Sequence, residues 1–369
     1  MIPFLVLLAL IVKIGSVVTC DILSASGNVR NLCQPRTSSS YFRHHSSKLF
    51  PRIRSCSSSA RRITDRHRRN LRNMCQHGVP ATSDRELFPE KFVQRTEYDC
   101  SKSTHEIYAV NSTRFAGPFS SSREKLDYSY HSNYEDDRRR LQDRIILNIL
   151  KEQGRSSRKY TKQLSLCNAS RWIVFTAGAM GSGKGYTMKW LARKNLFPLS
   201  SFIWVDPDEI REKLPEWNGY IEACPLRAAR LTNRETGMIS EILVQEALRR
   251  NHNVLIDGTM RDYQWYTESF LKLRKHFPEY RIAIVYIKAS LDKIKDRVKR
   301  RARSTGRVVP EDAINDSFVT VPTSIRELTP SVDFLAIVSN DIDDGEPVLT
   351  SPKNPEIFRR QWFAKKRGG

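Results

Sequence analysis

A glycine-rich stretch that ends in a lysine, residues 178–184, constrains the fold of this chain more than any other feature. It reads Gly-Ala-Met-Gly-Ser-Gly-Lys, follows the apolar run 172–176 and opens the helical pattern 185–193. Glycines between a strand and a helix let the backbone wrap closely around a bound group, and the amides of the helix N-terminus meet negative charge. The pattern therefore predicts a phosphate-binding loop, or P-loop, at the carboxyl end of a buried strand.

Strands and helices are predicted to alternate from residue 171 onward. Each strand candidate is a short apolar run rich in β-branched residues, as expected of strands buried on both faces. The strand candidates are residues 172–176, 202–205, 254–256, 282–287 and 334–338, and the helical patterns are residues 185–193, 226–250, 262–275 and 291–303. The alternation predicts an α/β fold of the P-loop NTPase or kinase type, with a parallel sheet covered by helices on both faces. We expect this domain to span residues 170–345.

The chain begins with a run of apolar residues, 2–12, followed by small residues up to Cys20. A run of this length is typical of a secretory signal peptide, whereas a helix that spans a membrane needs ~20 apolar residues. We therefore predict a signal peptide over residues 1–20, a mature chain without a transmembrane span, and a location in the secretory pathway or outside the cell. Because no Lys or Arg precedes the run and Lys13 follows it directly, an uncleaved signal anchor and a cytoplasmic protein without a signal remain alternatives.

Residues 21–134 are predicted to form a basic, largely disordered region rich in Ser and Arg. Within it, residues 21–80 contain 12 basic and 2 acidic residues and show no helical or strand periodicity. Such a segment buries too little apolar surface to offset the entropy lost on ordering. Its positive charge favours an anionic partner such as a nucleic acid, an acidic protein or a phosphoinositide membrane, although a solvated linker without a partner has the same composition.

Cleavage after Cys20 would leave an even number of cysteines. They are Cys33, Cys56, Cys75, Cys100, Cys167 and Cys224. A secretory route permits disulfides between them, but the pairing does not follow from the sequence, and free thiols are the alternative.

Two further segments flank the predicted domain. Apolar residues between Leu141 and Leu150 recur on one face of a helix, and Gly154 is expected to end it. We therefore predict that residues 135–154 form a helix that packs on the domain. Residues 346–369 at the C-terminal end are predicted to form a basic tail.

The P-loop predicts ATP as a ligand. Its backbone amides would surround the phosphates, and Lys184 would reach the β- and γ-phosphate oxygens. The residues predicted to bind ATP are Gly178, Ala179, Met180, Gly181, Ser182, Gly183, Lys184 and Gly185. Gly185 stands where a Ser or Thr normally offers a hydroxyl to Mg²⁺. We therefore expect Mg²⁺ to be held mainly by carboxylates, phosphates and water.

Three aspartates follow predicted strands, at the sheet edge where ligands bind in open α/β folds. Asp206 and Asp208 come after the strand 202–205, and Asp257 comes after the strand 254–256. Asp257 is predicted to hold Mg²⁺ through water, and Asp208 is predicted to accept the proton of an attacking hydroxyl. Aspartate is also a favoured helix N-cap, which is the alternative for Asp206 and Asp208.

Arginines are concentrated in the predicted helix 291–303 and directly after it. They are Arg297, Arg300, Arg301, Arg303 and Arg307. Phosphoryl transfer gathers negative charge on the γ-phosphate oxygens, so a cluster of cations on a closing segment predicts a lid over the phosphates. A basic surface helix or an RNA contact is the alternative.

Four segments, residues 174–190, 204–217, 254–261 and 297–310, together resemble the zeta-toxin family of P-loop kinases. The resemblance is clearest in AGAMGSGKG and VDPDEIREKLPEW, is closest to eukaryotic members, and covers about residues 170–345. Bacterial members of this family phosphorylate a sugar hydroxyl of UDP-N-acetylglucosamine with ATP and Mg²⁺. The resemblance therefore implies a kinase whose acceptor is a small, nucleotide-sugar-like molecule.

The resemblance also implies roles for particular residues. Lys184 matches the P-loop lysine of the family, and Asp208 matches its catalytic base. Glu241 and Thr259 fall on substrate-contacting positions, although the pattern around Glu241 taken alone is that of the solvent edge of an amphipathic helix. Asp257 stands in place of a glutamate.

Among the lid residues, Arg307 matches one phosphate-binding arginine of the family. The other is Arg297, Arg300 or Arg301, of which we take Arg301 as catalytic. Residues 211–235 share little with the bacterial substrate pocket, so the identity of the acceptor does not carry over.

We therefore expect an ATP-dependent phosphotransferase that acts on a hydroxyl of a small molecule such as a UDP-amino-sugar. An ATP-binding module without catalysis is one alternative, and Gly185 is the residue that favours it. A polynucleotide kinase that acts on RNA ends is a second alternative, which the basic arm would suit.

Overall fold

The computed structural model describes residues 99–166, 171–341 and 345–362. The predicted signal peptide, the basic segment 21–80 and four of the six remaining cysteines lie outside these residues. Within the described ranges, no helix combines the length and the apolar character needed to cross a membrane.

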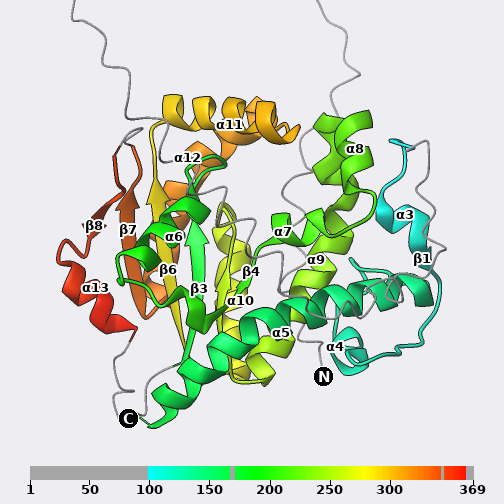
Figure 1. Cartoon of the computed structure of the whole chain (residues 1–369), viewed down its shortest axis with the longest axis horizontal. Coiled ribbons are helices and arrows are strands. Elements are labelled where there is room, and N and C mark those ends of the chain that lie inside the picture. The colour runs from blue at the N-terminus through cyan, green and yellow to red at the C-terminus, as the bar shows by residue number, and fades with distance from the viewer. Residues whose placement is uncertain (1–98, 167–170, 342–344, 363–369) are drawn as a thin grey trace, which may run out of the picture. The chain divides into compact units, whose positions relative to one another are not determined.

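A six-stranded sheet forms the centre of the described domain (Figure 1). In spatial order its strands are β4 (Phe202–Val205), β5 (Asn253–Ile256), β3 (Arg171–Ala177), β6 (Tyr280–Lys288), β7 (Phe334–Ser339) and β8 (Val348–Ser351). The strands β3 to β7 run parallel, and β8 pairs antiparallel with β7. The predicted parallel α/β sheet is confirmed, and each of its predicted strands is present.

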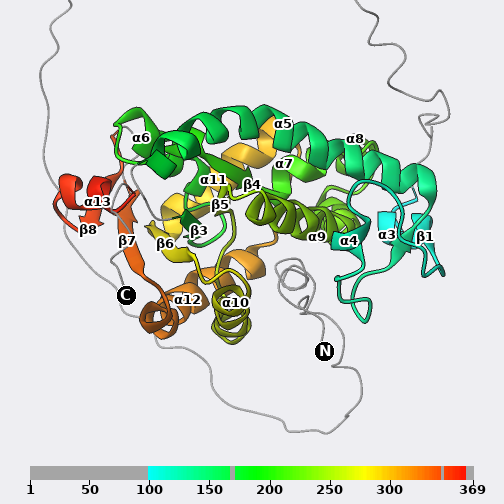
Figure 2. The ribbon, with the colours of Figure 1, turned by 90° about the horizontal axis from the view of Figure 1, so that it is seen from below.

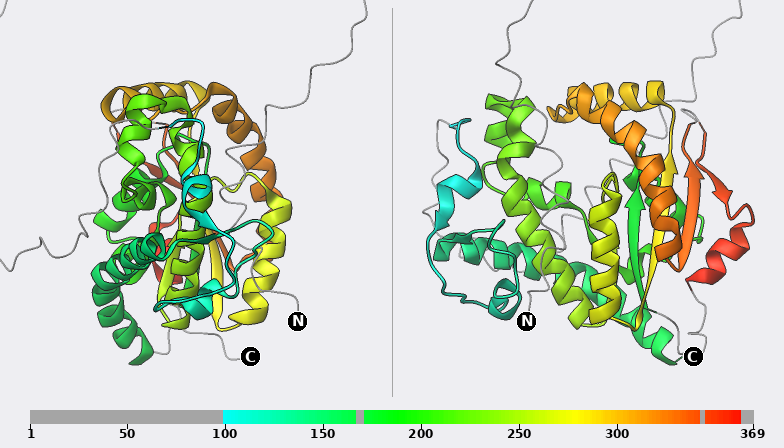
Figure 3. Two further views of the ribbon diagram at one scale, coloured as in Figure 1. Left: turned by 90° about the vertical axis from the view of Figure 1, so that its right-hand side faces the viewer. Right: turned by 180° about the vertical axis from the view of Figure 1, so that it is seen from behind.

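Helices lie on both faces of this sheet and around its edges. They are α5 (Asp136–Leu166), α6 (Lys184–Arg193), α7 (Pro207–Glu212), α8 (Trp217–Ala223), α9 (Pro225–Arg249), α10 (Tyr263–His276), α11 (Leu291–Thr305), α12 (Glu311–Leu328) and α13 (Pro355–Gln361). Figure 2 shows α6 on one side of the sheet and α10 and α12 on the other, and Figure 3 shows α10 and α12 side by side. The predicted helices correspond to α6, α9, α10 and α11.

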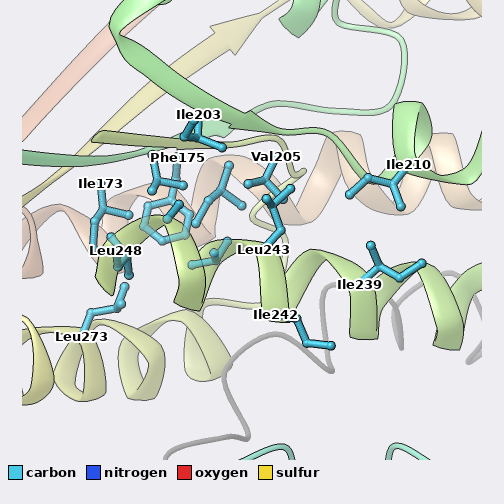
Figure 4. Packing of buried hydrophobic residues seen from close by; sticks show 14 of the residues in the cluster. Ile173, Phe175, Ile203, Val205, Ile210, Ile239, Ile242, Leu243, Leu248 and Leu273 are labelled. Carbon is cyan, nitrogen blue, oxygen red and sulfur yellow. The ribbon is translucent and has the colours of Figure 1, made fainter. Parts of the chain in front are cut away.

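The apolar character of the strands follows from burial on both faces. Successive residues of β3 belong to different clusters, Phe175 to the larger one and Val174 to the smaller one. Figure 4 shows Phe175 in the larger cluster with Leu243 of α9 and Leu273 of α10. A strand between two helical layers needs apolar residues at every position, because neither face meets water.

The structure corrects the prediction of disorder for residues 99–134. This segment forms α3 (Thr104–Tyr108), β1 (Ala109–Val110), α4 (Ser120–Arg123) and β2 (Asn133–Tyr134). Phe119, Leu126 and Tyr134 are at most 3% exposed and belong to the main core. Their irregular spacing gives no periodic signal, but their burial against α5 and α9 offsets the entropy of ordering that was expected to keep the segment unfolded.

The two flanking segments also differ from the prediction. The helix α5 continues past Gly154 to Leu166, because a single glycine is tolerated inside a helix, and the His252 ring lies beside Gly154. The predicted C-terminal tail contains β8 and α13, and Trp362 is 1% exposed against Trp172, at 5.2 Å between ring centroids. The described part of this segment therefore packs on the smaller apolar cluster, through Leu349, Phe358 and Trp362.

Cys100 and Cys224 form a disulfide. Cys100 precedes α3, and Cys224 is the residue between α8 and α9. The disulfide therefore joins the folded N-terminal segment to the helices that follow the second strand of the domain.

Candidate active site

The glycine-rich stretch 178–184 forms a tight loop between β3 and α6. Gly181 and Gly183 have φ angles of 90° and 86°, which L side chains rarely adopt. A Cβ atom on Gly183 would also lie 2.3 Å from Nδ2 of Asn340, which donates a hydrogen bond to the Ser182 carbonyl at 2.8 Å. The end of β7 thus fixes the loop from outside, and glycine is required where the two segments meet.

Lys184 is the first residue of α6 and lies over this loop. Its Nζ atom is 3.3 Å from the Gly178 carbonyl oxygen, to which it donates a hydrogen bond. The N-cap of α6 is Gly183, which supplies no capping side chain, so the first amides of the helix remain available to an anion. The hydroxyl of Ser182 is buried without a hydrogen-bond partner in the described structure. Residues 178–185 therefore form the cradle that the P-loop prediction requires.

The ring of Trp204 lies near Gly185. A Cβ atom built on Gly185 would meet this ring at 3.8 Å, an ordinary van der Waals contact. The position therefore has room for a small side chain, so packing against Trp204 does not require glycine at residue 185.

Asp206 and Asp257 lie at the ends of neighbouring parallel strands. Val205 of β4 is paired with Ile256 of β5, and the Asp257 amide donates a hydrogen bond to the Val205 carbonyl at 3.0 Å. Thr176 of β3 donates a hydrogen bond from its hydroxyl to Oδ1 of Asp257. Two carboxylates therefore meet beside the P-loop.

Burial, together with the charges of Asp257 and Asp208, raises the pKa of Asp206 to about 7. Asp206 is also the N-cap of α7, because its Oδ1 atom accepts a hydrogen bond from the Asp208 amide at 2.8 Å. The N-cap interpretation is thus confirmed for Asp206. The sequence analysis did not predict that Asp206 also lies close to Asp257 and has a raised pKa.

This oxygen-rich edge fits Mg²⁺, which prefers carboxylates and keeps several waters and phosphate oxygens as ligands. Asp206 and Asp257 would supply two carboxylates, and no group of three or more His, Cys, Asp or Glu residues arranged to hold a metal occurs in the described ranges. A bound nucleotide would therefore have to supply part of the coordination.

Asp208 lies in the first turn of α7 and is surrounded by arginines. Its Oδ1 atom accepts a hydrogen bond from Arg211 at 2.5 Å, and its Oδ2 atom accepts hydrogen bonds from Arg307 and, at 3.5 Å, from Arg301. Burial alone would raise the pKa of Asp208, but the three guanidinium groups outweigh burial and hold this pKa well below its usual range. The structure thus brings the predicted base together with two predicted lid arginines.

Arg211 was not predicted as a site residue. It lies one turn after Asp208 on α7, is 5% exposed, and also donates hydrogen bonds to Thr232 and Asn233 of α9. The spacing of three residues between Asp208 and Arg211 on a helix is the signal that would have indicated this pair.

The helix α11 lies beyond the carboxyl ends of the parallel strands, at the same edge as α7 (Figure 1). Arg297 approaches the P-loop, and its Nη1 atom is 4.0 Å from the position of a Cβ atom on Gly183. Arg301, one turn later, reaches Asp208. The lid helix therefore directs one arginine to the phosphate loop and another to the predicted base, while Arg300 and Arg303 are exposed.

Glu241 is not at a solvent edge. It is 1% exposed on α9, and its Oε2 atom lies 3.0 Å from Nε2 of His131 in the N-terminal segment. Burial raises the pKa of Glu241, and the hydrogen bond to His131 opposes this shift. The carbonyl of Thr259 accepts a hydrogen bond from the Gly178 amide at 3.1 Å, so Thr259 contacts the P-loop. Within the described chain no hydrogen bond joins Glu241 to Thr259.

A parallel sheet with a phosphate loop after β3, a carboxylate in the first turn of α7 and arginines on a covering helix is the arrangement of a P-loop kinase. The family model for zeta toxin matches residues 158–346, which is about half of the chain. The chain belongs to the zeta-toxin family. Its membership and its site support an ATP-dependent phosphotransferase.

Several solved structures are similar to the chain at low sequence identity. The AvrRxo1-ORF1:-ORF2 complex with ATP has 15% identity and a TM-score of 0.47, and the alignment covers 67% of this chain and 75% of that one. The PezAT toxin–antitoxin system of Streptococcus pneumoniae has 17% identity and a TM-score of 0.39, with 59% and 88% covered. A putative kinase from Chloroflexus aurantiacus has 13% identity and a TM-score of 0.35, with 52% and 96% covered. Among curated proteins there was no significant match.

Proposed function

We propose that this protein transfers the γ-phosphate of ATP to a hydroxyl of a small, nucleotide-sugar-like acceptor, such as a UDP-amino-sugar. The observation that carries the proposal is the position of Asp208, which lies at the P-loop edge of the sheet and is bound by Arg301 and Arg307. The carboxylate can accept a proton, and the two long arginine side chains can stabilise the negative charge that develops on the transferred phosphoryl group.

The contacts of Asp208 define what its arginines have to do during the reaction. While Arg307 and Arg301 bind the carboxylate, its low pKa makes it a weak base. A triphosphate on the P-loop carries more negative charge than one carboxylate and would draw both guanidinium groups toward its γ-phosphate. Asp208 would then be free to accept the proton of the acceptor hydroxyl, and Arg211 would keep the carboxylate oriented.

Nucleotide binding is assigned to the loop and its lysine. Lys184 would exchange the Gly178 carbonyl for phosphate oxygens, and the first amides of α6 would bind the same group. When bound, Mg²⁺ would neutralise phosphate charge. Asp206 and Asp257 would hold it, with Thr176 fixing the orientation of the Asp257 carboxylate.

An ATP-binding module without catalysis is the second candidate. Gly185 favours it, because no hydroxyl from the first turn of α6 is available to the metal. The two candidates differ in whether ATP is consumed when an acceptor is present.

We further propose that the protein enters the secretory pathway. The Cys100–Cys224 disulfide supports this proposal, because disulfides persist mainly in oxidising compartments. A signal peptide at residues 1–20 would provide the route.

The test is transfer of γ-³²P-phosphate from ATP to a panel of nucleotide sugars by the full chain in Mg²⁺ buffer, with Lys184→Ala in parallel. Labelling of one acceptor class that is lost in Lys184→Ala would establish the kinase. ATP binding without labelling of any acceptor would support the binding module instead.

A further inference from the structure

The loop that follows β1 carries a sequence pattern that the candidate active site does not use. Residues 111–113 read Asn-Ser-Thr, and an asparagine followed two residues later by threonine or serine is the acceptor pattern for N-linked carbohydrate. The same pattern begins at two further positions, Asn168 and Asn315. Because so short a pattern also arises by chance, its surroundings in the fold decide which position is a site.

The loop after β1 presents both side chains that the pattern requires. Asn111 is the central residue of a γ-turn, since the Ser112 amide donates a hydrogen bond to the Val110 carbonyl at 3.0 Å. Asn111 and Thr113 are exposed, and within the described chain no hydrogen bond engages either side chain. The amide and the hydroxyl are therefore open to an enzyme that approaches from solvent.

The loop is held in place by contacts that leave these two side chains out. Asn133 of β2 donates hydrogen bonds from Nδ2 to the carbonyls of Ser112 and Arg114, each at 2.9 Å. Arg139 of α5 donates another to the Arg114 carbonyl at 2.8 Å, and the Arg114 amide donates one to the Ser112 hydroxyl at 3.1 Å. The order of the loop thus depends on backbone carbonyls and on the middle residue of the pattern, and not on its first and third residues.

The position of β1 separates this loop from the candidate active site. Figure 1 shows β1 beyond α9, on the side of that helix that faces away from the central sheet, and the view from behind in Figure 3 agrees. The P-loop and α11 lie at the carboxyl edge of the sheet. A carbohydrate chain attached after β1 would therefore leave the nucleotide site open.

The pattern at Asn315 has different surroundings. Asn315 is exposed on α12, but Ser317 is fully buried, and its hydroxyl accepts a hydrogen bond from the Met180 amide of the P-loop at 3.2 Å. After folding, this hydroxyl is out of reach of an enzyme, whereas Thr113 stays accessible. The pattern at Asn168 lies outside the described residues.

The Cys100–Cys224 disulfide relates the loop to the compartment in which N-linked carbohydrate is attached. Cys100 precedes α3, and Asn111 follows β1, which is the next element of the chain. Disulfides persist in the lumen of the endoplasmic reticulum, where the carbohydrate is transferred to exposed asparagines. One segment of the fold therefore carries two features that belong to the same compartment.

We propose that Asn111 is an acceptor of N-linked carbohydrate, so that the kinase domain faces the lumen of the secretory pathway. The proposal rests on the proposed entry into that pathway. In the transfer, the side-chain nitrogen of Asn111 forms a bond to C1 of the first sugar of a lipid-diphosphate-linked oligosaccharide. The bond between this carbon and the diphosphate oxygen breaks, the lipid diphosphate leaves, and the nitrogen loses one proton.

The test uses the full chain expressed in cultured human cells, before and after treatment with a peptide N-glycosidase. This enzyme removes the carbohydrate and converts its asparagine into aspartate, so mass spectrometry of the peptides identifies the site. We expect aspartate at residue 111 after treatment. Asn111→Gln and Thr113→Ala should lose this carbohydrate, whereas Thr113→Ser, which keeps a hydroxyl, should retain it.

Two matched controls separate the acceptor from its surroundings. Ser112→Ala changes only the middle residue, which the pattern leaves free, and should retain the carbohydrate although the hydroxyl that binds the Arg114 amide is lost. Asn315→Gln removes the pattern on α12 and should also retain the carbohydrate at residue 111. The affinity of Asn111→Gln for an ATP analogue should equal that of the wild type, because β1 lies away from the P-loop.

The outcomes distinguish the site from the proposals on which it depends. Unmodified Asn111 in a chain recovered from the lumen or the medium, with the Cys100–Cys224 disulfide formed, would overturn the site and leave secretory entry standing. A chain that stays in the cytosol with both cysteines as free thiols would overturn secretory entry, and the site with it. Neither result would affect the assay of phosphate transfer, which tests the kinase by itself.

Discussion

Arg307 donates a hydrogen bond from Nη1 to Oδ2 of Asp208, and this contact ties the segment after α11 directly to α7. The residue expected to bind phosphate is thereby bound to the residue expected to act as the base. Without nucleotide, the cation stabilises the carboxylate and weakens it as a proton acceptor at the same time. Binding of a triphosphate and activation of the base are thus linked through one guanidinium group.

Replacement of Arg307 by Ala should lower turnover about 100-fold, because charge that develops on the transferred phosphoryl group loses a partner. Affinity for ATP should fall less than turnover. Arg303→Ala is the matched control, since Arg303 is exposed in the last turn of α11. Steady-state kinetics of both variants would check this. Equal loss of activity in the two variants would mean that α11 acts only through its overall charge.

Replacement of Asp208 by Asn should lower the melting temperature at pH 7 by about 3 °C or more, because buried Arg211 loses its ionised partner. The pKa of Asp208 is depressed in the folded protein, so its stabilising contribution is complete above the ordinary carboxyl pKa and disappears as the pH falls below it. The difference in melting temperature between the wild type and Asp208→Asn should therefore shrink below about pH 4. A difference that stays constant down to pH 2 would contradict the assigned ion pairs.

Introduction of a hydroxyl at residue 185 should strengthen metal binding. Gly185→Ser fits beside Trp204, and its Oγ atom would take the place that a Ser or Thr normally occupies. We expect Mn²⁺ to bind the complex with a non-hydrolysable ATP analogue about 3- to 10-fold more tightly, measured by electron paramagnetic resonance. Gly185→Ala supplies the same Cβ without the hydroxyl and should show no gain. Equal metal affinity in the Ser and Ala variants would show that a hydroxyl at residue 185 does not bind the metal.

Loss of the disulfide should destabilise the domain. Cys100 and Cys224 are 124 residues apart in the sequence, so their bond restricts a long loop in the unfolded chain. The double variant Cys100→Ser/Cys224→Ser should lose about 2–4 kcal/mol of unfolding free energy, measured by chemical denaturation. Dithiothreitol should destabilise the wild type by a similar amount and leave the double variant unchanged. Equal stability of the two proteins under oxidising conditions would show that the bond is not formed.

The sequence allowed prediction of those parts of the fold whose signals are local. The strands β3 and β6 are continuous apolar runs, and the P-loop between β3 and α6 has a fixed spacing of glycines and lysine. The geometry of the P-loop depends on few distant residues, one of which is Asn340, which donates a hydrogen bond to the Ser182 carbonyl. These elements were therefore predicted nearly to their ends.

The parts that the sequence did not indicate depend on contacts between distant segments. Residues 99–134 fold because Phe119 and Tyr134 find partners in α5 and α9, and no repeat within the segment reveals this. Glu241 resembles a surface residue in its own helix, but it is buried and paired with His131, 110 residues earlier in the sequence. Arg211 was missed for a different reason, since its pairing with Asp208 is local but common on helix surfaces.

The central claim is that Asp208 acts as the base of a P-loop kinase, and acceptor-dependent ATP consumption by the wild type and Asp208→Asn tests it most directly. The measurement uses the full chain with Mg²⁺ and the nucleotide sugar that the wild type phosphorylates. The affinity of both proteins for an ATP analogue is measured in parallel. We predict that the variant keeps its affinity within about threefold and loses acceptor-dependent turnover by at least about 100-fold. Turnover of Asp208→Asn at the wild-type rate would contradict the account.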